Sequence, residues 1–322
     1  MVIPHPTLPH PWKSAFKEKI FVAVYDSMDE YGALWDGDVG SIAAIHKIGH
    51  LSDPWSLPMD SPSLIDHPQV LRILFHPRSE QGYPPTQAAI ELCFPIDEQV
   101  SLGGRLYRSQ NVRGPLLLYW HGNGEIAADY DDLSTFYTDM GIHFLVVDFR
   151  GYGLSTSSPS GSALLNDAVA VVDGLKGEVE THCPGVTDNL FVMGRSMGSA
   201  AAIEIAFRRP EKIKGLILES AFAYTVELIE RLGGVSLDGT TEAAGFKSLE
   251  KMRSVQTPSL LIHGQEDVLI PVSDSQALFD ACPAADKKIV RIDHAGHNDL
   301  MLQGMQLYFE SIGRFVANIY QL

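Results

Sequence analysis

Cysteine and long apolar runs are scarce in this 322-residue sequence. The cysteines Cys93, Cys183 and Cys282 are scattered without C-x-x-C spacing, which argues against a disulfide framework and against a cysteine-rich zinc site. No apolar run reaches the roughly 18 residues that a transmembrane helix needs. The first residues, MVIPHPTLPHPWK, lack the charged-then-apolar layout of a secretory signal. We therefore expect a cytoplasmic protein without a membrane span.

Positive charge is also in short supply, because 24 Lys and Arg residues face 40 Asp and Glu residues and leave a net charge of -16. A surface field of this sign repels polyphosphate, and no run of Lys and Arg provides a local exception. We therefore do not expect nucleic acid as a partner. His and Cys do not cluster at the spacing of metal ligands, so we predict neither a metal nor another cofactor.

From residue 115 onward, short apolar runs alternate with helical stretches, which is typical of parallel strands joined by crossover helices. Their nearly continuous apolar character indicates strands that are buried on both faces. The expected strands are 115–120, 143–149, 189–194, 215–220, 259–264 and 287–292, with helices over 162–179 and 199–213. Residues 86–96 and 103–110 suggest an antiparallel lead-in to the same sheet. The sequence thus predicts a doubly wound, mostly parallel α/β sheet of about eight strands.

Polar segments follow four of the expected strands, at the end of the sheet where open α/β folds bind ligands. They are HGNGE, RSMG, QEDVLIP and DHAGHNDL. They contain a serine, an acid and a histidine in the order Ser196, Asp267, His297, which is the chain order of one known hydrolytic triad. Ser196 alone could be a helix cap, but the coincidence of the four segments favours a catalytic site.

The segments HGNG, DFRGYG, GRSMG, IHGQED and AGHND resemble those of the α/β-hydrolase superfamily, and the resemblance covers about residues 86–322. Within that superfamily the chain is most similar to small-lid serine hydrolases that include depalmitoylase-type enzymes, with prolyl-oligopeptidase-type and dienelactone-type relatives further away. The resemblance implies that Ser196 is the nucleophile, His297 the base and Asp267 the acid that orients it. It also implies an oxyanion hole formed by the main-chain N–H groups of Asn123 and Met197.

Two neighbouring residues compete for these roles. His294 lies just before His297, and the small Ala-Gly pair that precedes His297 matches the usual G-H of the superfamily. Glu266 adjoins Asp267, and the superfamily pattern G-x-x-D favours the aspartate. We expect His121 to form a structural hydrogen bond rather than to transfer a proton.

An insertion at residues 223–258 is predicted to form a small lid with two helices. Its residues Leu228, Ile229 and Leu232 either line an acyl pocket or pack the lid onto the core.

Residues 1–70 lie outside the catalytic domain predicted at 71–322. They form an N-terminal extension of unknown role, in which a helix is expected around residues 16–28.

These features predict a metal-independent serine hydrolase that cleaves a carboxylic ester or thioester through an acyl-enzyme, with a small-molecule or acylated substrate. Amide or peptide hydrolysis by the same residues is an open alternative, because the triad does not encode the leaving group. A non-catalytic binding protein on the same fold is the second alternative. The sequence predicts no oligomeric state.

Overall fold

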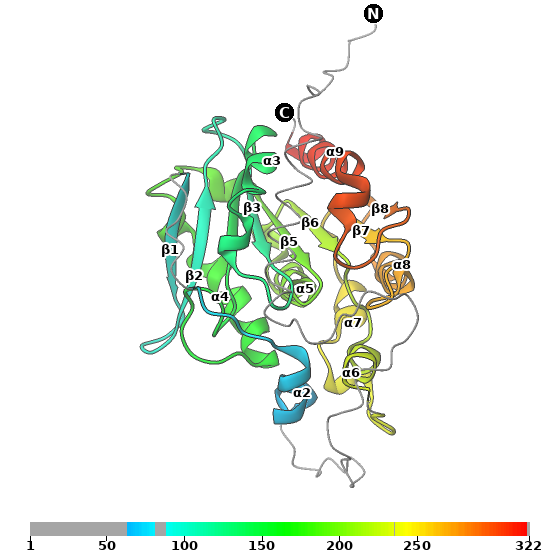
Figure 1. Cartoon of the computed structure of the whole chain (residues 1–322). Helices are drawn as coiled ribbons and strands as arrows, with labels where there is room; N and C mark the ends of the chain where they lie inside the picture. Colours follow the sequence, from blue (N-terminus) through cyan, green and yellow to red (C-terminus); the bar gives the residue numbers. More distant parts are fainter. Residues whose placement is uncertain (1–62, 81–87, 235, 321–322) are drawn as a thin grey trace, which may run out of the picture. The chain divides into compact units, whose positions relative to one another are not determined.

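The computed structural model describes residues 63–80, 88–234 and 236–320 (Figure 1). The helix expected around residues 16–28 lies outside these ranges. The described residues form an eight-stranded sheet with the order β1-β2-β4-β3-β5-β6-β7-β8. The predicted doubly wound α/β fold is therefore confirmed.

The strands occupy the predicted segments to within a few residues. They are β1 (Ala89–Pro95), β2 (Ser101–Tyr107), β3 (Leu116–Trp120), β4 (His143–Val147), β5 (Leu190–Arg195), β6 (Gly215–Glu219), β7 (Ser259–Gly264) and β8 (Lys287–Ile292). The pairs β1–β2 and β2–β4 are antiparallel, and all other strand pairs are parallel. Every residue of β3 to β7 is buried, which explains their nearly continuous apolar character.

The α-helices are α2 (Pro68–Leu74), α3 (Ser134–Asp139), α4 (Gly161–Val179), α5 (Gly198–Arg208), α6 (Thr225–Gly233), α7 (Ser248–Met252), α8 (Val272–Ala281) and α9 (Leu300–Tyr320). Short 3₁₀ turns are η1 (Leu64–Asp66), η2 (Ala127–Tyr130), η3 (Val186–Asn189), η4 (Pro210–Lys212) and η5 (Glu242–Ala244). Helix α4 matches the helix predicted at 162–179. Helix α5 covers most of the one predicted at 199–213 and ends at Arg208, because Pro210 cannot continue a helix. We did not predict α8 and α9 from the sequence.

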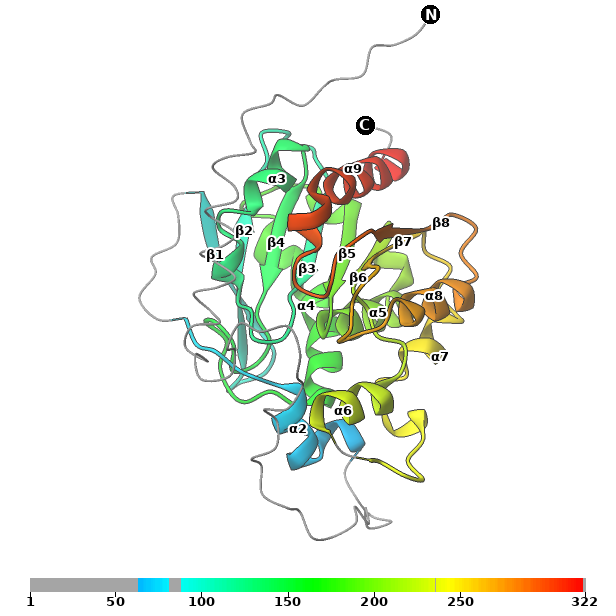
Figure 2. The same cartoon turned by 45° about the vertical axis from the view of Figure 1, so that its right-hand side comes forward.

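Helices cover both faces of the sheet (Figures 1 and 2). On one face, Tyr137 of α3 and Phe309 of α9 share a buried cluster with Leu117 and Tyr119 of β3. α4, α5 and α8 pack on the other face. Burial of each such large side chain contributes roughly 1.5–3 kcal/mol. The packing holds the parallel strands in line, so that their carboxyl ends meet at one edge of the sheet.

The lid prediction corresponds to α6, η5 and α7. Leu228 and Ile229 are buried, at 3% and 0% exposure, whereas Leu232 is partly exposed. Helix α2 packs against α6 and η1 packs against α4. Part of the predicted N-terminal extension, residues 64–70, thus lies against the lid and the sheet helices.

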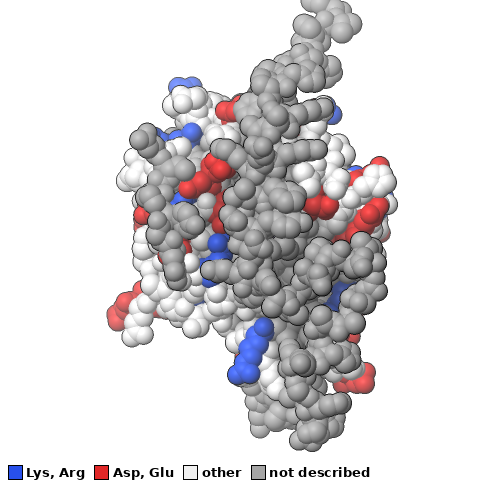
Figure 3. Space-filling view, viewed as in Figure 1, with Lys and Arg blue, Asp and Glu red and all other residues white. Residues whose placement is uncertain are grey.

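The surface view in Figure 3 shows Lys and Arg side chains scattered among acidic ones on the described part of that face. Within the described ranges, no helix combines the length and the apolar character needed to cross a membrane.

Candidate active site

Ser196 lies on a tight turn between β5 and α5. Its φ is 50°, a left-handed conformation that is rare for a residue with a side chain. The Ser196 N–H donates to the carbonyl of Glu219 at 2.9 Å, which fixes the turn. A Cβ at Gly194 would lie 2.2 Å from the carbonyl oxygen of Gly198, and one at Gly198 would lie 2.1 Å from that of Trp120. The turn therefore requires both glycines.

His297, in the loop after β8, contacts both Ser196 and Asp267. Its Nε2 lies 2.9 Å from Ser196 Oγ, and its Nδ1 lies 2.7 Å from Asp267 Oδ2. A carboxylate only accepts hydrogen bonds, so the proton belongs on Nδ1 and the Nε2 lone pair faces the serine hydroxyl. The side chains of His297 and Asp267 are 8% and 0% exposed. This is the order of contacts that base-assisted attack by a serine needs.

Asp267 is held by four donors. Its Oδ1 accepts the N–H groups of Leu269 and Ile270 at 2.9 and 2.8 Å, and its Oδ2 faces His263 Nε2 at 3.2 Å as well as His297. Burial alone would raise the pKa of Asp267, but the hydrogen bonds from His263 and His297 hold it well below its usual value. The carboxylate is therefore ionised across the physiological range.

His263 helps to hold the Asp267 carboxylate, and the sequence did not reveal this contact, although His263 lies in the segment IHGQED. It is fully buried, with Nε2 2.7 Å from the carbonyl of Ile270 and Nδ1 2.6 Å from Ser275 Oγ. Because Nε2 faces two acceptors, it carries the proton and Ser275 donates to Nδ1. The signal available in the sequence was its position near the end of the predicted strand 259–264, at i,i+4 spacing from Asp267.

Burial lowers the pKa of His297, and the positive charge of Arg195 lowers it further, while Asp267 acts in the opposite direction. The net effect is a pKa below the ordinary value of 6.5. His297 is therefore neutral at physiological pH, which is the state that accepts a proton.

The competing residues contact partners other than Ser196. His294 and Glu266 form an exposed pair at 3.1 Å, with side chains 84% and 64% exposed. His121 is fully buried, with Nδ1 2.7 Å from the carbonyl of Gly122 and Nε2 3.4 Å from Asp148. The fold thus brings His297 and Asp267 to the serine, and it uses His121 within the core.

Asn123 and Met197 both lie next to the turn that carries Ser196. Within the described residues, neither main-chain N–H takes part in a hydrogen bond. The Asn123 side chain is engaged elsewhere, since its Oδ1 accepts from the His76 N–H at 2.9 Å and from the Tyr152 hydroxyl at 2.7 Å. From the sequence we predicted a role only for the main-chain N–H of Asn123, and none for its side chain.

Residues 76–80, here named the strap, run along the loop that contains Asn123. Arg78 Nε donates to the carbonyl of Gly124 at 3.1 Å, and the Arg78 guanidinium pairs with Asp129. The Gly153 N–H donates to the carbonyl of Arg78 at 2.8 Å. The strap precedes residues 86–322, which resemble the superfamily. It nevertheless holds the loop of Asn123, which lies in the candidate site.

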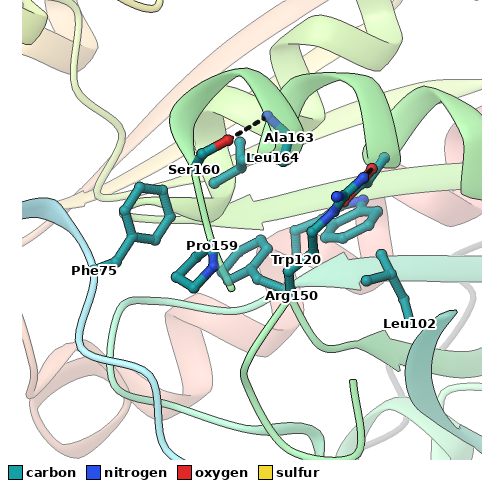
Figure 4. Close-up of a pocket in the computed structure, with 10 residues that line it drawn as sticks. Phe75, Leu102, Trp120, Arg150, Pro159, Ser160, Ala163 and Leu164 are labelled. Atoms are coloured by element: carbon teal, nitrogen blue, oxygen red, sulfur yellow. Dashed lines mark hydrogen bonds and ion pairs between the residues drawn. The ribbon is translucent and has the colours of Figure 1, made fainter. Parts of the chain in front are cut away.

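A small pocket lies between the start of α4 and the carboxyl ends of β3 and β4 (Figure 4). It is lined by Phe75, Leu102, Trp120, Phe149, Arg150, Pro159, Ser160, Ala163, Leu164 and Asp167. Arg150 bonds to both carboxylate oxygens of Asp167, at 2.6 and 2.7 Å. Ser196, Asp267 and His297 do not line this pocket, so we do not assign the pocket to substrate.

Comparisons with known proteins agree with the fold. Residues 112–237 and 240–301 match the family model described as "Serine aminopeptidase, S33". Protein bem46 of Schizosaccharomyces pombe is 29% identical over 209 residues, which are 63% of this chain and 67% of that protein. The alpha/beta hydrolase domain-containing protein aho-3 of Caenorhabditis elegans is 30% identical over 208 residues, which are 62% of this chain and 57% of that protein.

Solved structures show the same architecture. The esterase Pf2001 of Pyrococcus furiosus superposes with a TM-score of 0.63 at 20% identity, over 76% of this chain and 99% of the esterase. A monoacylglycerol lipase of Paleococcus ferrophilus superposes with a TM-score of 0.53 at 18% identity, over 67% of this chain and 98% of the lipase. At these identities the likeness concerns the fold alone.

Proposed function

The chain belongs to the α/β-hydrolase family described as serine aminopeptidase S33, and we propose that it is a serine hydrolase that cleaves a carboxylic ester or thioester. The observation that carries the proposal is the hydrogen-bonded series Ser196–His297–Asp267. Three residues from three separate loops meet there in the geometry that activates a serine.

In the proposed reaction, Ser196 Oγ attacks the substrate carbonyl carbon while His297 Nε2 takes the hydroxyl proton. The tetrahedral intermediate collapses, the bond to the alcohol or thiol breaks, and His297 returns the proton to the leaving group. Water then attacks the acyl-enzyme by the same route and releases the acid and free Ser196. Asp267 stays ionised throughout and stabilises the charged imidazole, in keeping with its lowered pKa.

The negative oxygen of the intermediate is assigned to the main-chain N–H groups of Asn123 and Met197. Their lack of partners among the described residues supports this assignment. Each such donor usually contributes about 10² to 10³-fold in kcat.

An aminopeptidase would have to bind the α-ammonium group of its substrate, which calls for a free carboxylate beside the serine. Of the described carboxylates near Ser196, Glu125 and Glu219 already pair with Arg195. This supports an uncharged acyl group over a free amino acid residue. Among the three lid residues proposed to meet an acyl chain, the partly exposed Leu232 is the accessible one.

A fluorophosphonate probe tests the proposal, because it reacts with activated serines. It should label the wild-type chain and the Ser273→Ala control, which removes an exposed serine on α8, but not Ser196→Ala. Folded wild-type protein that resists the probe would favour a non-catalytic binding protein.

The substrate class needs a second measurement. We expect nitrophenyl esters and acyl thioesters to give higher kcat/KM than aminoacyl nitroanilides with a free α-amino group. The reverse order would make the chain an aminopeptidase that uses the same triad.

A further inference from the structure

The residue before the proposed nucleophile is an arginine whose side chain is only 9% exposed. Burying a guanidinium is costly unless it is fully paired, so its partners indicate its purpose. The Arg195 side chain contacts the loop of Asn123, the end of β6 and the loop of His297. The chemistry proposed above uses none of its atoms.

The first contacts fix the loop that carries the base. Arg195 Nη2 donates to the carbonyl oxygen of His297 at 3.1 Å and to Asn298 Oδ1 at 2.9 Å. The guanidinium thus binds the main chain of His297 itself. The imidazole of the same residue meets Ser196, the neighbour of Arg195 in sequence.

The second contact fixes the loop of the proposed oxyanion hole. Arg195 Nη1 pairs with Glu125 Oε1, and Glu125 Oε2 accepts the N–H of Gly122 at 2.7 Å and the hydroxyl of Tyr130 at 2.6 Å. A Cβ at position 122 would lie 2.3 Å from Arg195 Nη1. Glycine at this position is what lets the guanidinium lie against the residue before Asn123.

The third contact ties the same side chain to the turn of the serine. Arg195 Nε lies 3.2 Å from Glu219 Oε1, and the Glu219 carbonyl accepts the Ser196 N–H at 2.9 Å. The Glu219 carboxylate also accepts the hydroxyl of Tyr308, on α9, at 2.7 Å. One planar cation therefore joins the segments HGNGE, GRSMG and AGHND.

We propose that Arg195 is a positioning residue that holds the His297 loop and the Asn123 loop in register with Ser196. The inference rests on the proposed function. Arginine suits this role because its rigid fork donates in several fixed directions at once, whereas lysine carries a compact charge on a flexible stem. Displacement of a reacting group by about 1 Å can cost on the order of 10²-fold in rate, so three loops held by one side chain are a sensitive point.

The test compares Arg195→Lys with Arg209→Lys. Arg209 also makes a bidentate pair, with Asp173, but on the exposed end of α5. With an ester that the wild-type protein hydrolyses efficiently, Arg195→Lys should lower kcat by about 10 to 100-fold and change KM by less than about twofold. Arg209→Lys should change neither kcat nor KM. A folded Arg195→Lys protein with wild-type kcat would overturn the proposal.

A structural role alone would lower the melting temperature without this split between kcat and KM. If Arg195→Lys fails to fold, Asn298→Ala decides, because it removes one acceptor of the guanidinium at an exposed residue. It should lower kcat with KM unchanged, and an unaltered kcat would count against the proposal.

A readout that needs no turnover separates this inference from the proposed function. In the described part of the chain, the charged or titratable groups that face the His297 ring are Asp267, His263 and Arg195. The charge of Arg195 is itself countered by Glu125 and Glu219. In a Ser196→Ala background, nuclear magnetic resonance titration of His297 should give a higher pKa with Arg195→Gln than with Arg195. An unchanged His297 pKa would contradict the contact, whether or not the wild-type chain labels with the probe.

Discussion

His297 Nε2 lies 2.9 Å from Ser196 Oγ, although the two residues are 101 positions apart in the chain. In the proposed reaction the two side chains act as a unit, so Ser196→Ala and His297→Ala should each lower kcat by up to ~10⁶-fold, and the double variant should be little worse than either. Steady-state kinetics on a nitrophenyl ester measures all three. Losses that add across the double variant would contradict a shared role.

The two adjacent acids should differ sharply. Asp267→Asn should lower kcat on the order of 10⁴-fold, because the amide no longer stabilises the imidazolium or fixes the Nδ1 proton. Glu266→Gln is the matched control, since among the described residues the Glu266 side chain pairs only with exposed His294. Near-wild-type kcat for Asp267→Asn and a large loss for Glu266→Gln would reverse the assignment.

Activity should persist into mildly acidic conditions. The proposed reaction needs neutral His297, and burial together with Arg195 lowers the pKa of His297 below the ordinary 6.5. A group with a lowered pKa stays unprotonated until the pH falls through that lowered value, so the acid limb of the kcat/KM profile should lie below pH 6.5. An acid limb above that value would show that the charged imidazole is favoured instead.

Asn123 allows main-chain and side-chain effects to be separated. Asn123→Pro removes the N–H proposed for the oxyanion hole and should lower kcat at least 10² to 10³-fold. Asn123→Ala keeps that N–H and should cost less than about tenfold in kcat. It should also lower the melting temperature, because the contacts with His76 and Tyr152 are lost.

Circular dichroism must show that both Asn123 variants are folded. Equal, severe losses in the two folded proteins would mean that the side chain, rather than the main chain, stabilises the oxyanion.

Activity should survive chelation. In the part of the chain that the structure describes, no three His, Cys, Asp or Glu side chains are grouped so that they could hold a metal ion. Incubation with EDTA should therefore leave the ester hydrolysis rate unchanged. A loss that a divalent ion restores would refute metal independence.

The sequence by itself determined the strands and the candidate residues at their ends. Strands such as β3 and β5 are buried on both faces, so each is apolar along nearly its whole length, and this signal is local. The tight turn at Ser196 likewise needs glycines at fixed short distances, which a single sequence displays. Local signals did not reveal α9, although it packs on the sheet.

Only the tertiary structure decided which of the neighbouring polar residues meet. His297 and His294 have the same side chain, and their difference lies in burial and in contacts made by loops far apart in sequence. The roles of His263 and Arg195, and the hold of the strap on Asn123, likewise depend on partners remote in the chain. A hydrogen bond depends on distance and direction in space, and folding sets both only after the strands have paired and the helices have packed.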